Sequence, residues 1–233
     1  MTTREMQYDF KMKFNKVDSQ KNRNLLVPEI DWLMNEACDI FVKLIAEPRK
    51  KNHLGFEANQ RSIDDIRTLV VPGTWTTVTN NLFPLPANYK FYVRGRAMLS
   101  KGNCKDKEAL LFVREHRDIF EESTFYNSSF EWREVNCLFN SDGIQMFTDG
   151  TFTIDKVKIT YIRKMAYMHN AQDFGSGTYN NLQGVALTGM VNCELPEHTH
   201  REIVDIAVAL AAGQIQTSDF QAKFAKLNLN QIV

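Results

Sequence analysis

The sequence predicts an α+β protein, with an antiparallel β-sheet or small sandwich flanked by N-terminal and C-terminal helices. Apolar residues recur at helical spacing near both ends, whereas residues 74 to 162 favour β-branched and aromatic types with a period of two. Two Asp-Gly pairs, Asp142-Gly143 and Asp149-Gly150, separate three apolar-rich segments in this region. Because Asp-Gly is typical of tight hairpin turns, we expect these segments to form an antiparallel meander.

A short helix is expected over residues 2 to 17. Thr2 and Glu5 have the spacing of a capping box, in which each side chain satisfies the backbone N–H of the other residue. Met6, Phe10 and Phe14 follow at four-residue steps and give the helix one narrow apolar stripe.

A longer helix is expected from Pro28 to about Glu47, because proline suits the first helical turn and Pro48 ends the pattern. Its wide apolar face includes Trp32 and Phe41. Such a face packs either in the chain's own core or against another subunit. The first alternative is favoured and both stay open.

The β region begins after a third expected helix, residues 59 to 69, and the pair Pro72-Gly73. Before the meander, we expect strands at 74–79, 89–99 and 109–113, a loop at 101–107, and one helical turn at 118–123. In the last strand of the meander, three alternating residues should face the core: Val157, Ile159 and Tyr161.

The C-terminal part is expected to hold a glycine-containing irregular loop, a helix and a tail. The helix runs from Pro196 to Ala212 with Gly213 at its end, and its buried stripe includes Ile203 and Leu210. The tail carries Phe220, Phe224 and Leu227 at helical spacing and should dock on the chain's own body or on a neighbour. The predicted organisation is therefore a helical region (1–72), a β scaffold (73–165), an irregular loop (166–194) and a C-terminal helix with its tail (195–233).

Composition narrows the function classes. The 233 residues hold 28 basic and 28 acidic side chains, so zero net charge argues against bulk binding of nucleic acid. No apolar run is long enough for a membrane helix, and the first residues do not resemble a secretory signal, so we expect no membrane partner. The four cysteines are far apart, which favours free thiols in a reducing cytosol.

No catalytic, cofactor or metal site is expected. The sequence has no nucleophile-elbow motif, no zinc-protease motif and no phosphate-binding glycine pattern. His198 and His200 form the one constellation that could hold a metal, but residues two apart on a helix point in different directions. An enzyme remains the least favoured class.

Three stretches carry a resemblance to a known family. They are IDWLMNEACDIFV (30–42), GFEANQRSIDDIRTLVV (55–71), and, within 129–208, SFEWREVNCLF, TDGTFTIDKVKITYIRK and ELPEHTHREIVDIAV. In this order they resemble structural proteins of crAss-like bacteriophages, most closely the ring or connector proteins that stack below the portal.

The resemblance implies a non-enzymatic virion protein without cofactors, assembled in the host cytoplasm. It would be a subunit of a dodecameric head-to-tail connector ring that contacts the portal and other tail proteins and encloses a channel for DNA. In that reading, the apolar side chains of the helices and tail are candidates for the subunit interface: Met6, Phe10, Phe14, Trp32, Phe41, Ile203, Leu210, Phe220, Phe224 and Leu227.

The alternative is a carbohydrate-binding or tail-fibre-associated β module. Aromatic side chains of a β fold can form platforms for sugar rings, and four residues would serve here: Trp75, Tyr89, Tyr92 and Trp132.

Overall fold

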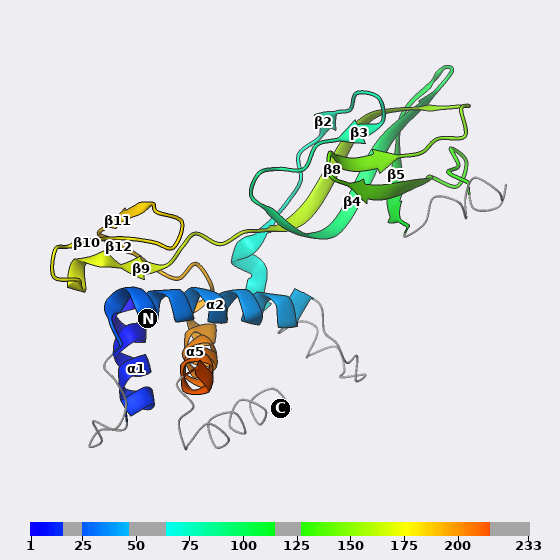
Figure 1. Cartoon of the computed structure of the whole chain (residues 1–233). Coiled ribbons are helices and arrows are strands. Elements are labelled where there is room, and N and C mark those ends of the chain that lie inside the picture. The colour runs from blue at the N-terminus through cyan, green and yellow to red at the C-terminus, as the bar shows by residue number, and fades with distance from the viewer. Residues whose placement is uncertain (16–24, 47–63, 115–126, 215–233) are drawn as a thin grey trace, which may run out of the picture. The chain divides into compact units, whose positions relative to one another are not determined.

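The computed structural model describes residues 1–15, 25–46, 64–114 and 127–214, which form two compact units (Figure 1). The helical unit is built from both sides of the chain, Met1–Leu69 and Met165–Val233. The sheet unit is the continuous stretch Val70–Lys164. The expected helical turn at 118–123 and the tail residues Phe220, Phe224 and Leu227 lie outside the described residues.

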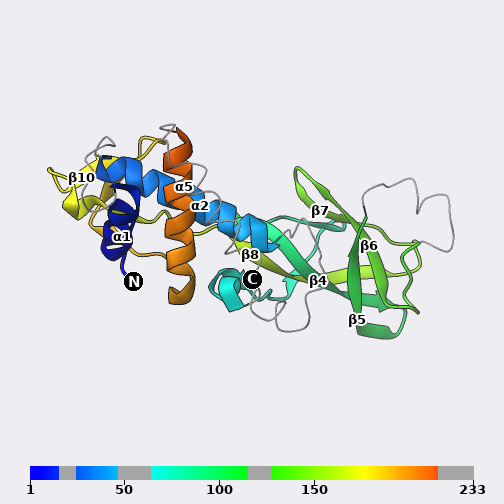
Figure 2. The same ribbon diagram turned by 90° about the horizontal axis from the view of Figure 1, so that it is seen from below.

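Three long helices form the centre of the helical unit. They are α1 (Thr3–Asn15), α2 (Val27–Ala46) and α5 (His200–Gln214). Helix α5 packs against both α1 and α2 (Figures 1 and 2). It follows the 3-10 turn η3 (Glu197–Thr199) and continues to Gln214, so the expected end at Gly213 is wrong.

The predicted capping box at the start of α1 is confirmed. The Thr2 backbone N–H donates to Glu5 Oε2 over 2.8 Å, and the Glu5 N–H donates to Thr2 Oγ1 over 3.3 Å. A similar bond precedes α2, where the Leu26 N–H donates to Glu29 Oε2 over 2.8 Å. The Glu5 and Glu29 side chains thus satisfy backbone donors that have no partner within their helices.

Four short strands lie in the segment 166–194, where sequence analysis expects an irregular loop. Strand β9 (His169–Asn170) pairs with β12 (Met190–Val191), and β10 (Thr178–Asn180) pairs with β11 (Ala186–Thr188). The 3-10 turn η2 (Ala171–Asp173) follows β9. These pairs are too short for the period-two pattern to stand out in the sequence.

The sheet unit is one curled, mostly antiparallel sheet, which confirms the α+β fold class. The third expected helix is described from Asp64 and ends in the 3-10 turn η1 (Arg67–Leu69), directly before the sheet. The strand order is β1-β8-β4-β5-β6-β7-β3, with β2 also paired to β8. Strands β5 and β6 are parallel, and the other pairs are antiparallel. The strands are β1 (Val70–Val71), β2 (Thr76–Thr77), β3 (Leu82–Phe83), β4 (Tyr89–Lys101), β5 (Cys104–Val113), β6 (Glu134–Asn140), β7 (Gly143–Met146) and β8 (Thr153–Arg163).

The expected meander is confirmed as a hairpin at its first turn, although Asp142-Gly143 is not the central pair, and it is wrong at its second turn. Strands β6 and β7 form a tight hairpin, with Asn140 paired to Gly143 and Ser141-Asp142 as the two central residues. Strand β7 does not continue to β8, because β8 pairs with β4, β1 and β2 instead. The Asp149 carboxylate accepts a bond from the Thr151 N–H over 2.8 Å, which is an Asx turn inside a longer loop.

The expected loop at 101–107 is also wrong. Strands β4 and β5 form a hairpin in which Lys101 pairs with Cys104, so only Gly102 and Asn103 lie between them. Gly102 has a φ of +56°, which suits glycine in such a turn.

Alternation in β8 places the core as expected. Val157, Ile159 and Tyr161 are buried, which confirms that prediction. They pack in one cluster with side chains from the other strands and loops: Phe83, Ala97, Leu99, Ala109, Leu111, Phe130, Val135, Cys137, Ile144, Met146, Phe152 and Ile154.

Candidate functional site

The interface candidates fall into three groups. Five of them are buried in the helical unit: Met6, Phe10, Phe14, Phe41 and Ile203. Phe10 and Phe14 stack with ring centroids 5.7 Å apart, and Leu210 is partly buried. Trp32 is 38% exposed on α2. The buried residues thus have packing roles within the chain, and an interface role for Trp32 and Leu210 stays a prediction.

A buried carboxylate is the centre of the polar contacts in the helical unit. Asp31 on α2 accepts hydrogen bonds from the Tyr179 hydroxyl (2.6 Å), the Asn170 N–H (3.0 Å) and the Gln7 side-chain amide. These partners lie on β10, β9 and α1 respectively. One side chain therefore joins α1, α2 and the segment of short strands.

Burial dominates the electrostatics of Asp31. It raises the pKa of the carboxyl group above its usual value, although the bonds from Tyr179, Asn170 and Gln7 oppose that effect. Sequence analysis missed this residue. The available signal was its position in one helical stripe with Met34 and Cys38, three and seven positions later, both of which are buried.

Further side-chain bonds tie the 166–194 segment to the two N-terminal helices. Asn35 on α2 donates through Nδ2 to the Met168 carbonyl over 2.7 Å and accepts the Met168 N–H over 2.9 Å. Thr3 on α1 donates through Oγ1 to the Val191 carbonyl over 2.8 Å, and its N–H donates to Asn192 Oδ1 over 3.0 Å. The helices hold this segment through polar pairs as well as apolar packing.

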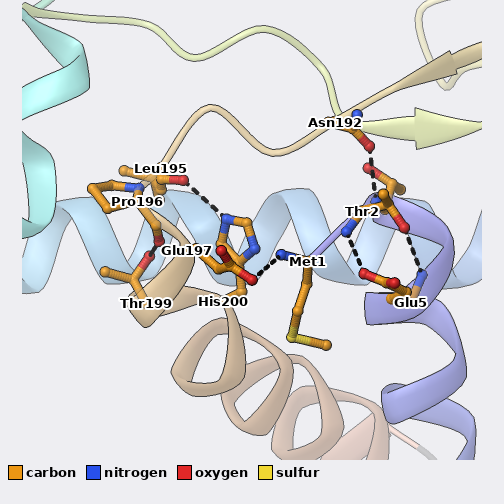
Figure 3. A network of polar contacts seen from close by, with 10 residues as sticks. Met1, Thr2, Glu5, Asn192, Leu195, Pro196, Glu197, Thr199 and His200 are labelled. Atoms are coloured by element: carbon orange, nitrogen blue, oxygen red, sulfur yellow. Dashed lines mark hydrogen bonds and ion pairs between the residues drawn. The ribbon is translucent and has the colours of Figure 1, made fainter.

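The start of α5 carries a second polar cluster (Figure 3). The N-terminal ammonium of Met1 lies 2.9 Å from Glu197 Oε1. His200 is buried, and its Nε2 lies 2.9 Å from the Leu195 carbonyl oxygen. His198 turns to Asp65, with Nε2 2.7 Å from Oδ1. The two histidines therefore have separate partners.

The pKa of the Cys193 thiol is lowered below its usual value. Hydrogen bonding with Cys38 lowers its pKa, burial opposes this, and contact with His200 lowers the pKa further. The same contact raises the pKa of His200. The two shifts have opposite directions, because the pKa of the thiol is lowered and that of the imidazole is raised.

No three histidine, cysteine, aspartate or glutamate side chains gather as a metal site within the ranges that the structure describes. None of the helices in those ranges has the length and apolar character of a membrane-spanning segment.

The four expected sugar-platform residues have different neighbours, and a sugar-binding role for them stays a prediction. Tyr89 packs against Phe139 and Tyr161 at centroid distances of 6.3 and 5.9 Å, and Tyr92 meets Phe139 edge-on. The Lys158 ammonium lies 4.4 Å from the Trp75 ring centroid. Trp132 is held on a separate turn.

Trp132 is 80% exposed at the tip of a firmly closed turn. Ser129 and Glu134 exchange two backbone hydrogen bonds of 2.9 and 3.1 Å, which closes a four-residue loop before β6. Phe130 in this loop is buried, with the Lys107 ammonium 4.3 Å from its ring centroid. Arg133 adopts a φ of +58°, a conformation that is uncommon for a non-glycine residue.

Comparison with known proteins gives the class of protein that this chain resembles. No family model matches the sequence. The chain is similar to a phage ring protein, which agrees with the resemblance found in the three sequence stretches.

That relative is Ring protein 4/5 of Bacteroides phage crAss001. It is 24% identical over 239 residues, which cover 95% of this chain and 96% of the relative. The similarity confirms the resemblance to a ring protein of a crAss-like phage and supports a ring-type structural role.

Proposed function

We propose that this chain is a structural subunit of a ring in a phage virion, without enzymatic activity. The ring is a dodecameric connector between portal and tail and encloses the channel through which DNA passes. It assembles in the host cytoplasm and contacts the portal and other ring proteins. The observation that carries the proposal is similarity to a phage ring protein along nearly the full length of both chains.

The structure supports this proposal in two ways. Each unit has its own buried core, as a rigid building block requires. Each unit also exposes large apolar side chains, such as Leu182 on the helical unit and Trp132 on the sheet unit, at 81% and 80%. Tryptophan is among the residues that are enriched in protein interfaces, which makes Trp132 the better candidate of the two for a contact with another protein.

Localisation in particles tests the proposal. An antibody raised against this chain, with gold labelling of purified virions, is expected to mark the vertex that joins head and tail. Electron micrographs of the purified chain, alone and mixed with portal protein, are expected to show rings. Absence of the chain from virions would contradict the proposal.

A further inference from the structure

Two thiols and an imidazole lie together where the chain enters α5. Cys193 follows β12 in the link to η3, Cys38 lies on α2, and His200 is the first residue of α5. The Cys193 and Cys38 side chains are hydrogen-bonded to each other, and Cys193 is also hydrogen-bonded to His200. The fold therefore brings together a thiol pair and a possible base from three separate elements.

The His200 ring is oriented by the backbone. Its Nε2 lies 2.9 Å from the Leu195 carbonyl oxygen, which can only accept, so Nε2 carries the proton of the neutral ring (Figure 3). Nδ1 is then the nitrogen that can take a further proton. It is buried and has no oxygen or nitrogen partner in the part of the chain that the structure describes. His200 can thus receive the proton of the adjacent Cys193 thiol.

Exposure distinguishes the two thiols. Cys38 is 0% exposed, whereas Cys193 is partly exposed and follows the exposed Asn192. A small reagent can therefore reach Cys193 first. The lowered pKa of Cys193 also increases the fraction of thiolate, which is the form that attacks a disulfide.

We propose that Cys193 is a modification site for small disulfides such as glutathione disulfide, with His200 as its base and Cys38 as the resolving thiol. The product is an internal disulfide between Cys38 and Cys193. The inference goes beyond the ring function and does not rest on it.

The reaction consists of two thiol–disulfide exchange steps. The Cys193 thiol gives its proton to His200, and its sulfur attacks one sulfur of glutathione disulfide. The S–S bond of the reagent breaks, and the leaving glutathione thiolate takes the proton from His200. The Cys38 sulfur then attacks the Cys193 sulfur of the mixed disulfide, and the second glutathione leaves with the Cys38 proton. Two protein thiols are oxidised, and one glutathione disulfide is reduced to two glutathione molecules.

The internal disulfide would fasten α2 to the segment that leads into α5. It closes a long loop of the chain, and a cross-link of this kind stabilises a protein mainly by restricting its unfolded state. A reducing cytoplasm keeps both thiols free, so the disulfide would form when the chain meets oxidising solvent.

Intact-mass spectrometry and peptide mapping of the full chain test the site. The parent protein carries Cys104→Ser, which removes the exposed thiol. After incubation with glutathione disulfide at pH 7, the parent should contain a Cys38–Cys193 disulfide and retain no glutathione. With Cys38→Ala added, one glutathione should stay on Cys193. With Cys193→Ala added, none should bind, because Cys38 is buried. Cys137 is the internal control and should stay a free thiol, because it is buried as well.

His200→Gln tests the base. The glutamine amide can still donate to the Leu195 carbonyl, but it takes no proton at pH 7. The first exchange step should therefore be slower by about tenfold or more. His198→Gln is the matched control, because His198 pairs with Asp65 and should not affect the rate. Circular dichroism would verify that each variant is folded.

Thermal unfolding of the parent, oxidised and reduced, measures the fastening without a further variant. The oxidised form should unfold at a temperature about 5 °C or more above that of the reduced form, and dithiothreitol should reverse the difference. An equal or lower unfolding temperature would contradict the fastening.

Two results would overturn the site: a parent that does not react, or a parent in which glutathione stays on Cys193 without transfer to Cys38. An exchange rate that His200→Gln leaves unchanged would overturn the role of the base. None of these results affects the ring function, which gold labelling of virions tests separately.

Discussion

The Tyr179 hydroxyl lies 2.6 Å from Oδ2 of Asp31, although 148 positions separate these residues in the chain. The bond places a residue of β10 against the buried face of α2, near the start of that helix. It also completes a set of three donors around a carboxylate that has no contact with water. Asp31 therefore joins Asn35 and Thr3 among the side chains that position the 166–194 segment.

Asp31→Ala should strongly destabilise the helical unit. It leaves the Tyr179 hydroxyl, the Asn170 N–H and the Gln7 amide without their acceptor, and unpaired buried donors cost about 1–3 kcal/mol each. We expect the free energy of unfolding in urea to fall by about 3 kcal/mol or more. Asp31→Asn should cost less than half as much, because the amide oxygen still accepts two of the bonds. Equal losses of unfolding free energy for Asp31→Ala and Asp31→Asn would contradict the role of Asp31 as a hydrogen-bond acceptor.

The stability of the wild type relative to Asp31→Asn should increase as the pH falls from 7 to 4. Burial raises the pKa of Asp31, so the folded state holds its proton more tightly than the unfolded state. The resulting stabilisation is complete below the ordinary aspartate pKa of about 3.9 and disappears as the pH rises through the folded-state pKa. Urea unfolding of both proteins across this range measures the difference. In the wild type, the bond from Tyr179 lowers the pKa of Asp31. Tyr179→Phe removes that bond and should therefore raise the pKa of Asp31, which shifts the change in stability to higher pH.

Gly143→Ala should destabilise the sheet unit more than Gly150→Ala. At Gly143, with φ of +141°, a Cβ atom would lie 2.2 Å from the Phe83 carbonyl oxygen on the neighbouring strand. At Gly150, with φ of +80°, no atom lies within 4 Å of the added Cβ. We expect a loss of about 2 kcal/mol or more for Gly143→Ala and about 1 kcal/mol for Gly150→Ala, from thermal unfolding. A larger loss of stability for Gly150→Ala than for Gly143→Ala would show that backbone strain at positive φ outweighs the steric clash.

Cys193 should react with iodoacetamide far faster than Cys137 in the folded protein at pH 7. Cys137 is buried, and burial raises its pKa to about 12, whereas hydrogen bonding with Cys38 and contact with His200 lower the pKa of Cys193. With the exposed Cys104 changed to serine, mass spectrometry of the labelled peptides should give a rate ratio of roughly a hundredfold or more. Cys38→Ala should move the onset of Cys193 labelling to higher pH. A labelling rate that still rises about tenfold per pH unit between 6 and 8 would exclude a lowered pKa at Cys193, because it is the behaviour of an ordinary thiol.

Local rules in the sequence predicted the parts of the fold that depend on neighbouring residues. The Thr2–Glu5 capping box and the alternation of Val157, Ile159 and Tyr161 each involve residues within a few positions of one another, and both predictions are confirmed. No short-range pattern in the sequence shows which distant strands will pair. The parallel match of Leu110 with Glu134 and the place of β8 between β1 and β4 depend on packing across the whole sheet.

The candidate site was harder to predict for the same reason. The spacing of Met6, Phe10 and Phe14 is equally suited to a core and to a subunit interface, and the chain uses these residues in its own core. Asp31 acquires its role from Gln7, Asn170 and Tyr179, which no short-range pattern connects. Trp132 could be recognised as aromatic from the sequence, but its exposure depends on the closure of the turn by Ser129 and Glu134.

The division of the chain has a consequence for the order of folding during synthesis. The sheet unit enters at Val70 and leaves near Ile162, and these two residues are paired between β1 and β8. The ribosome therefore finishes the sheet unit before it has synthesised α5, the helix against which both α1 and α2 pack. The sheet can form first as an independent unit, and the earliest helices must wait until almost the whole chain has emerged before their apolar faces are covered.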